Sequence, residues 1–198
     1  PKYRGAAPIQ WSLINGDSET GLTTFILQPK VDTGNVLQQK KIAIDQDDNY
    51  GSLAEKMSNA GAELLVETMD EFEKGNLNPY AQDDVKATTA RKISAEMTII
   101  NWQKSAQEIH NLIRGLTPSP GVHTLLSGKG LKIFETEFIK ENSALNKGEI
   151  SIIEKKYFSI QTGAGQLIVL QVQLEGKRRM STGDFLRGVQ FEVGTCLG

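Results

Sequence analysis

The sequence predicts an α/β module over residues 1–75 and a mostly β module over residues 95–198, joined by a linker over 76–94. The first module mixes β-rich and helix-like runs, whereas the second carries five short β-like runs between turns. The charge also divides. Residues 1–89 hold 8 Lys+Arg against 14 Asp+Glu, a balance of -6, and residues 90–198 hold 14 against 10, a balance of +4. A basic second module suits an anionic partner such as nucleic acid, although chance imbalance on a solvated surface would give the same counts.

The first elements of the α/β module are a helix and a pair of strands. Pro8 suits the first turn of a helix over 8–15. The runs 21–28 and 36–44 are rich in β-formers, so we expect a hairpin-like pair around the turn-rich loop 29–34.

The clearest helix spans residues 51–73, and Gly75 follows it as a stop signal. Its apolar residues recur at helical spacing. They are Leu53, Met57, Ala60, Leu64 and Met69. The following segment 76–94 is polar, contains Pro79 and lacks apolar periodicity, which is typical of a linker between domains.

The second module begins with an amphipathic helix over 105–115, for which Ser105 is the expected N-cap. Short strands follow, and a last helix over 181–187 is expected to be capped by Ser181. Several short strands at this spacing predict a small barrel or a sandwich. The strands are expected at 122–126, 131–139, 149–154, 157–161 and 166–174.

The composition predicts a soluble intracellular protein. Hydrophobic residues make up 38% and charged residues 23%, as in globular proteins. The single cysteine, Cys196, cannot form an internal disulfide, which fits a reducing compartment. No stretch approaches the roughly 18 apolar residues of a membrane span. No His or Cys cluster at metal spacing and no phosphate-cradling glycine motif is present, so neither a metal nor a nucleotide cofactor is expected.

Several segments together resemble the methionyl-tRNA formyltransferase family. The opening PKYRGAAPIQWSLINGDSETGLTTF is similar to the stretch that follows the Asn-x-His-x-Ser-Leu-Leu-Pro signature of folate-dependent formyltransferases, and KVDTGNVL is similar to their Asp-Thr-Gly loop. The later segments ATTARKIS, INW, IRGLTPSPG and GKRRMSTGDFL resemble the C-terminal domain of the tRNA enzymes in particular. The resemblance covers essentially the whole chain.

The resemblance implies both a fold and an activity. It implies the C-terminal part of a Rossmann-like formyltransferase domain, followed by an oligonucleotide-binding (OB)-like β-barrel. The family transfers a formyl group from 10-formyltetrahydrofolate to the amino group of methionyl-initiator tRNA in translation initiation. A cytoplasmic monomer that needs no metal is expected. On this resemblance the chain begins just after the signature that carries the family's Asn and His, so the chain by itself is expected to be inactive.

The resemblance assigns catalytic and folate-binding residues. Asp32 matches the family's catalytic Asp, which orients and charges the His, although Asp-Thr-Gly is also a common turn tripeptide. Pro1 matches the last Pro of the signature and is expected near the folate. Arg4 is either an anion binder or a structural arginine. Neither His110 nor His123 lies in the Asn-x-His context, so both are expected to be structural or surface residues.

Five basic residues are the candidates for tRNA binding. Lys177, Arg178 and Arg179 form a run between a strand and a helix, and Arg91 and Lys92 lie at the end of the linker. They suit tRNA phosphates, which proteins recognise largely by charge and shape, although a charge run is usually only a solvated turn.

Two further functions stay open. A related folate-dependent formyltransferase acting on a sugar nucleotide or a purine precursor would share the front motifs but not the rear ones. A non-catalytic tRNA-binding module would suit a chain without the signature.

Overall fold

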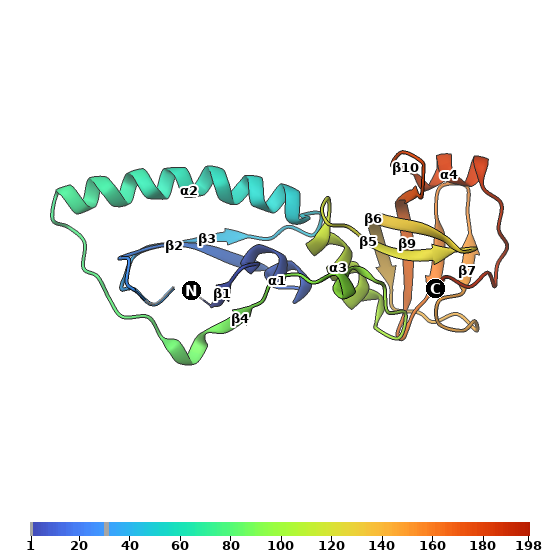
Figure 1. Ribbon diagram of the computed structural model, residues 1–198, viewed down its shortest axis with the longest axis horizontal. Coiled ribbons are helices and arrows are strands. Elements are labelled where there is room, and N and C mark those ends of the chain that lie inside the picture. Colours follow the sequence, from blue (N-terminus) through green and yellow to red (C-terminus); the bar gives the residue numbers. More distant parts are fainter. Residues whose placement is uncertain (1, 30–31) are drawn as a thin grey trace. The chain divides into compact units, whose positions relative to one another are not determined.

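The computed structural model describes residues 2–29 and 32–198, with the side chain of Lys86 left out. The chain forms two compact units, unit 1 at Pro1–Ile93 and unit 2 at Ser94–Gly198 (Figure 1). Each predicted helix and strand is present, with ends moved by three residues or fewer. The predicted mixture of helices and β structure is therefore confirmed, and the division into named domains stays a prediction.

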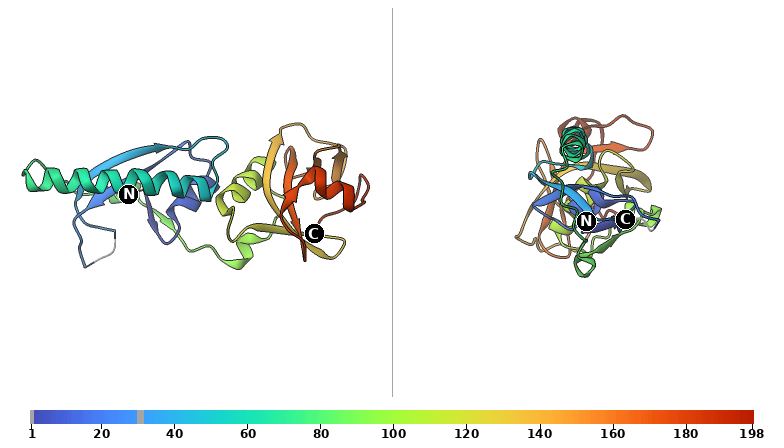
Figure 2. Two further views of the ribbon diagram at one scale, coloured as in Figure 1. Left: turned by 90° about the horizontal axis from the view of Figure 1, so that it is seen from above. Right: turned by 90° about the vertical axis from the view of Figure 1, so that its left-hand side faces the viewer.

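Unit 1 is built around a β-hairpin and one long helix. Strands β2 and β3 pair antiparallel, with Glu19 opposite Ala43. Helix α2 lies along the hairpin, as the views from the side and from above both show (Figures 1 and 2). The elements of unit 1 are β1 (Tyr3–Gly5), α1 (Pro8–Ile14), β2 (Glu19–Phe25), β3 (Val36–Ala43), α2 (Tyr50–Glu73), η1 (Asp84–Lys86) and β4 (Thr88–Ala90).

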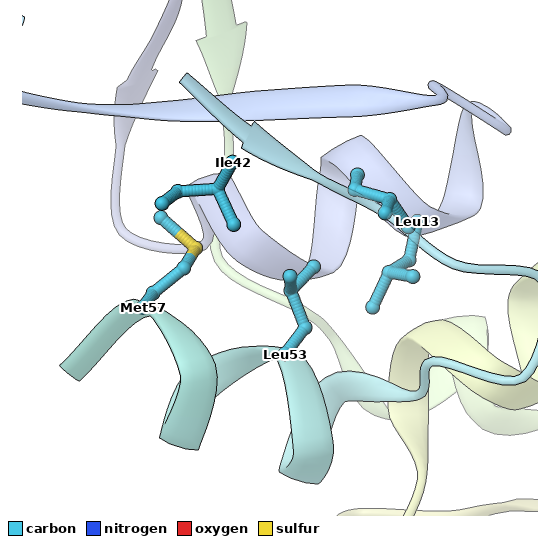
Figure 3. Packing of buried hydrophobic residues seen from close by; sticks show 5 residues of the cluster. Leu13, Ile42, Leu53 and Met57 are labelled. Carbon is cyan, nitrogen blue, oxygen red and sulfur yellow. The ribbon is translucent and has the colours of Figure 1, made fainter. Parts of the chain in front are cut away.

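The core of unit 1 lies where α1, β3 and α2 meet. Leu53 and Met57 point from α2 toward Ile42 of β3 and Leu13 of α1 (Figure 3). All four side chains are buried, and Ile44 completes the cluster. Helix α2 begins with a capping box, in which Asn49 accepts from the Ser52 N–H and the Ser52 hydroxyl accepts from the Asn49 N–H. The periodic apolar residues and this cap together account for the length and start of α2.

The prediction is wrong for one residue of the apolar face of α2. Met69 is 58% exposed, whereas its neighbour Thr68 is buried. The Thr68 hydroxyl hydrogen-bonds the Gln38 side chain at 2.7 Å and the Thr24 hydroxyl at 3.0 Å. This polar contact with β2 and β3 sets which side of the helix faces the hairpin, and Met69 consequently turns to solvent.

The segment predicted as a linker, 76–94, is bonded along unit 1. Strand β4 pairs in parallel with β1, with Tyr3 opposite Thr88 and Gly5 opposite Ala90. Ala90 is fully buried. Neither three-residue strand was expected, because a strand of this length has no measurable periodicity. Residues 76–93 are therefore part of a folded unit.

Unit 2 is a β-sheet with a helix packed against it. The sheet order is β5-β6-β9-β8-β7, and β10 pairs with β9. Helix α3 packs on β6 and β9, and both its cap at Ser105 and the cap of α4 at Ser181 are as predicted. The elements of unit 2 are η2 (Ala95–Thr98), α3 (Ala106–Leu116), β5 (Val122–Leu126), β6 (Lys129–Ile139), β7 (Ile150–Ile153), β8 (Phe158–Gln161), β9 (Gln166–Leu174), β10 (Met180–Ser181) and α4 (Thr182–Gly188).

The C-terminal segment lies between the two outer strands of this sheet. Leu197 bridges to Leu126 at the end of β5, and Cys196 bridges to Glu149 just before β7. Among the described residues, β5 and β7 are the two outer strands of the sheet and do not pair with each other. The C-terminal segment is bridged to the chain at both of them.

Candidate functional site

Asp32 lies in the connection between β2 and β3. Its backbone is in the left-handed region, with φ of +58°. Residues other than glycine rarely adopt this conformation, but Asp tolerates it better than most because its short polar side chain can hydrogen-bond locally. The side chain is partly buried. The turn therefore holds a carboxylate in one defined backbone conformation near the end of the hairpin.

At Gly34, two residues later, the main chain of this connection passes very close to the main chain of Ile26. A Cβ built at Gly34 would lie 1.6 Å from the carbonyl oxygen of Ile26, a main-chain atom. The Ile26 N–H donates to the Asn35 carbonyl at 2.9 Å across the same contact. Only glycine fits this approach, which explains the third residue of the Asp-Thr-Gly sequence.

Segment 80–84 supports the same connection from the other side. Tyr80 and Val36 exchange two main-chain hydrogen bonds of 2.8 and 3.1 Å. The Gln82 side-chain amide donates to the Gly34 carbonyl at 2.7 Å. The predicted linker thus supplies part of the Asp32 site, which local sequence patterns did not indicate.

Arg4 has the structural role among its two expected roles. Its Nη2 donates to Gln82 Oε1 at 3.0 Å and forms an ion pair with Asp84 at 2.7 Å. The side chain is 19% exposed. Both contacts use Nη2, whereas the buried Nε has no hydrogen-bond partner among the described residues, and through Nη2 Arg4 connects β1 to segment 80–84.

The predicted folate contact Pro1 lies outside the described residues. The neighbouring residues are fixed by Asp17, whose carboxylate accepts from Lys2 at 3.2 Å and from the Tyr3 hydroxyl at 2.6 Å. The hydrogen bond to Asp17 raises the pKa of Lys2, and burial raises the pKa of the Tyr3 hydroxyl. Lys2 is thus cationic at neutral pH.

Arg91 and Lys92, candidates for tRNA contact, are exposed at the end of unit 1. The Arg91 guanidinium lies 5.5 Å from the centre of the Trp11 ring, and the Trp11 indole N–H donates to the Arg91 carbonyl at 2.8 Å. Stacking on an aromatic ring orients a guanidinium without hiding it from solvent.

The basic run Lys177–Arg179 is exposed in the turn between β9 and β10. Arg179 lies over the ring of Phe134, 4.3 Å from its centre, and donates to the side chain of Gln171. These contacts hold Arg179 on the surface formed by β6 and β9. The acidic side chain of Glu175 begins the same turn and bonds the Gly130 N–H.

Both histidines have structural contacts. His110, on α3, hydrogen-bonds the Thr136 hydroxyl at 3.0 Å and tilts against Phe138. Burial, aided by the charge of Arg114, lowers the pKa of His110 to about 4, so the ring is neutral at pH 7. His123 accepts a main-chain hydrogen bond from Ile100 through its carbonyl.

Residues 2–29 and 32–198 contain no group of three His, Cys, Asp or Glu placed to hold a metal ion. None of the helices so described has the length and apolarity that crossing a membrane requires.

The chain matches two families and a group of named relatives. The family described as formyl transferase matches residues 1–69, and the formyl transferase C-terminal domain matches residues 92–190, half of the chain. The methionyl-tRNA formyltransferase of Agathobacter rectalis is 45% identical over 98% of this chain and 63% of its own length. That of Lachnospira eligens is 40% identical over 100% of this chain and 64% of its own. The chain therefore spans about 63% of the length of the curated relatives it matches.

Solved structures share the fold at low identity. HypX from Aquifex aeolicus, in complex with tetrahydrofolic acid, superposes with a TM-score of 0.70 at 18% identity, over 97% of this chain and 35% of HypX. The sugar 3N-formyl transferase WlaRD gives a TM-score of 0.69 at 21% identity, over 90% of this chain and 63% of its own. At these identities the likeness concerns the fold alone. The two matched regions, one in each unit, show that the chain belongs to the formyl transferase family.

Proposed function

We propose that the whole protein transfers a formyl group from 10-formyltetrahydrofolate to the amino group of methionine on initiator tRNA. One observation carries the proposal. Relatives named methionyl-tRNA formyltransferase are 40–45% identical to this chain over essentially all of it, through both units. The reaction belongs to translation initiation, and we place it in the cytoplasm with the protein acting as a monomer.

The transfer exchanges one carbon–nitrogen bond for another. The amino group of the methionine attacks the formyl carbon and forms a tetrahedral oxyanion. The bond from that carbon to N10 of the folate then breaks, and N10 receives the proton that the attacking amine loses. The step needs a donor for the oxyanion and a group that moves one proton, and it calls for no metal ion.

Asp32 is the catalytic residue of this proposal within the described chain. A carboxylate accepts a hydrogen bond from an imidazole and stabilises its protonated form, which is the role the family resemblance gives to this position. Two features of the turn support the assignment. The carboxylate belongs to a left-handed residue that the close Gly34 contact fixes, and it is only partly buried. Pro1 is proposed to contact the folate beside it.

Unit 1 is proposed to be part of the Rossmann-like catalytic domain, and unit 2 an OB-like barrel. The barrel proposal is supported by the C-terminal segment, which hydrogen-bonds both outer strands of the sheet. Gly198 donates to the Leu125 carbonyl at 3.1 Å, and Ile150 donates to the Thr195 carbonyl at 2.9 Å. The domain limits are part of this proposal, with 1–75 assigned to the catalytic domain and 95–198 to tRNA binding, while residues 76–93 fold with unit 1.

The tRNA is proposed to bind the basic side chains by its phosphates. Arg179 is held in place on Phe134 and Arg91 on Trp11, so both guanidinium groups are oriented before any ligand arrives. Lys177, Arg178 and Lys92 add exposed charge. Few exposed aromatic rings accompany these cations, so phosphate contact should dominate over base stacking.

The alternatives have weaker support. Sugar formyltransferases share only the fold with this chain, at 21% identity for WlaRD. No feature of the described residues favours a purine substrate or a purely binding role.

The test is a transfer assay with the whole protein, 10-formyltetrahydrofolate and methionyl-initiator tRNA. Asp32→Asn keeps the size of the side chain and removes its charge, so we expect a fall in kcat of about 10²-fold or more with the fold unchanged. Asp47→Asn, at an exposed carboxylate in another loop, is the matched control and should stay near wild type. Activity of Asp32→Asn within a few-fold of wild type would remove the catalytic assignment. Formylation of an amino sugar nucleotide in preference to the tRNA would replace the proposed substrate.

A further inference from the structure

We infer that Gln82 and Arg4 are positioning residues that set the place of the Asp32 turn. The inference rests on the proposed function for its effect on turnover, but its structural part is independent of it. Gln82 is 48 residues from the glycine it bonds, and it belongs to the segment that the sequence alone predicts as a linker.

Gln82 contacts the turn directly through its side-chain amide. Its amide N–H donates to the Gly34 carbonyl at 2.7 Å, two residues after Asp32. The main chain at Gly34 lies against the main chain of Ile26, which leaves little space for Gly34 to move. A change in the hydrogen bond to the Gly34 carbonyl should therefore alter the position of the turn. Asp32 itself has a φ of +58°, a conformation that costs free energy in most residues other than glycine and that contacts on the neighbouring main chain help to maintain.

Arg4 determines which way the Gln82 amide faces. Its guanidinium can only donate, and it donates to Gln82 Oε1 at 3.0 Å. The amide oxygen is therefore fixed toward Arg4 and the amide nitrogen toward Gly34. Asp84, whose side chain is exposed, pairs with the same guanidinium nitrogen at 2.7 Å and adds a second contact between Arg4 and segment 80–84.

Segment 80–84 is also hydrogen-bonded to β3 through its main chain. Tyr80 exchanges two main-chain hydrogen bonds with Val36, the first residue of β3. Gln82 is thus held within two residues of a main-chain anchor, and the Asp32 turn ends at the same anchor. A loosened Gln82 contact should shift Asp32 without unfolding the hairpin.

Expected kinetics follow from this geometry. Neither residue is proposed to touch the substrate, so substrate binding should change little while the reacting geometry suffers. A displacement of about 1 Å in a catalytic group can cost on the order of 10²-fold in rate. We expect kcat to fall by about 10- to 100-fold with KM for the tRNA changed less than about threefold.

The experiment compares three glutamine variants in the whole protein. Gln82→Glu keeps the size and the acceptor for Arg4 but places a carboxylate oxygen against the Gly34 carbonyl. Gln82→Leu removes both bonds. Gln103→Leu is the control, because this exposed glutamine lies in unit 2 and accepts a hydrogen bond from Lys147 at 3.0 Å without contacting the turn or segment 80–84.

Each variant is measured for kcat, KM and hydrogen exchange of the amides at 32–35. Both Gln82 variants should lower kcat and speed exchange at these amides, whereas Gln103→Leu should do neither. Arg4→Leu should act in the same direction. The double variant of Arg4→Leu with Gln82→Leu should be no worse than Gln82→Leu alone, because Arg4 acts through Gln82.

The outcomes separate this inference from the proposed function. Unchanged exchange at 32–35 in both Gln82 variants would overturn the inference, whatever the activity. So would faster exchange with wild-type kcat in a protein where Asp32→Asn is inactive. If Asp32→Asn is fully active, the proposed function fails, and the exchange measurement alone then decides whether Gln82 holds the turn.

Discussion

Replacing Gly34 by alanine is the most direct perturbation of the Asp32 site. The added Cβ would lie 1.6 Å from the Ile26 carbonyl oxygen and 2.8 Å from its carbon. Cβ atoms in proteins essentially never lie within 3.0 Å of another heavy atom. The segments at Gly34 and Ile26 must therefore separate by at least 1.4 Å, the difference between 3.0 and 1.6 Å. Both clashing atoms are main chain, and no side-chain rotation relieves the contact.

Such a separation affects both stability and catalysis. Overpacking of this kind typically costs about 1–3 kcal/mol of unfolding free energy. The 2.9 Å bond from Ile26 to Asn35 spans the same gap and should weaken as well. Because Asp32 lies two residues away, a shift above 1 Å should lower kcat by about 10²-fold.

The assay combines chemical denaturation with formyl-transfer kinetics of the whole protein. Gly61→Ala is the matched control in the same unit. Its Cβ would lie 3.8 Å from the nearest atoms, in the middle of α2, so it should stabilise the helix by about 0.5–1 kcal/mol and leave kcat unchanged. A Gly34→Ala protein with wild-type stability and a kcat within a few-fold of wild type would refute the reasoning about the turn.

Three other predictions concern the core, the basic turn and the buried histidine. Leu53→Ala removes a fully buried side chain from the unit 1 core and should cost about 2–5 kcal/mol by urea denaturation, and a cost under 1 kcal/mol would contradict the packing seen there. Charge reversal of all three residues at 177–179 should weaken binding to many RNAs alike and flatten the slope of log K against log salt by roughly 2–3. Reversal of the exposed pair Lys155 and Lys156 is its control, and equal effects of both would argue against a specific basic turn. Because burial lowers the pKa of His110 from 6.5 to about 4, the unfolded state binds more protons between these values. Stability should therefore be complete above about pH 6.5 and fall by up to about 3 kcal/mol toward pH 4. His110→Gln should flatten this pH dependence, and an unchanged dependence would show that other groups cause it.

Elements with strong local signals were predictable from the sequence. Helix α2 was expected at 51–73 and spans Tyr50–Glu73, because the apolar periodicity that begins at Leu53 and the stop signal at Gly75 define it. The caps at Ser105 and Ser181 were likewise predicted, since a capping side chain acts within three residues. Met69 was misassigned because a polar contact from Thr68 to β2 and β3 outweighed the apolar pattern.

Contacts between distant segments were not predictable from local patterns. The parallel pairing of β1 with β4 joins Tyr3 to Thr88, and the bond from Gln82 supports the Asp32 turn across 48 residues. Neither segment is apolar or periodic, so each resembled a loop. The family resemblance indicated Asp32 but not the residues that support it.

The C-terminal segment has a consequence for the behaviour of unit 2 in concentrated solution. An outer strand with unpaired amide and carbonyl groups is a template on which further chains can add strands and aggregate. Here residues 194–198 pair with the main chain at both rims of the sheet, at Leu125–Leu126 and at Gly148–Ile150. Leu197 is buried as it does so, at 2% exposed. A second molecule can add a strand at these rims only after residues 194–198 have dissociated from them. Local unfolding of this segment is therefore the step that would permit self-association through the sheet.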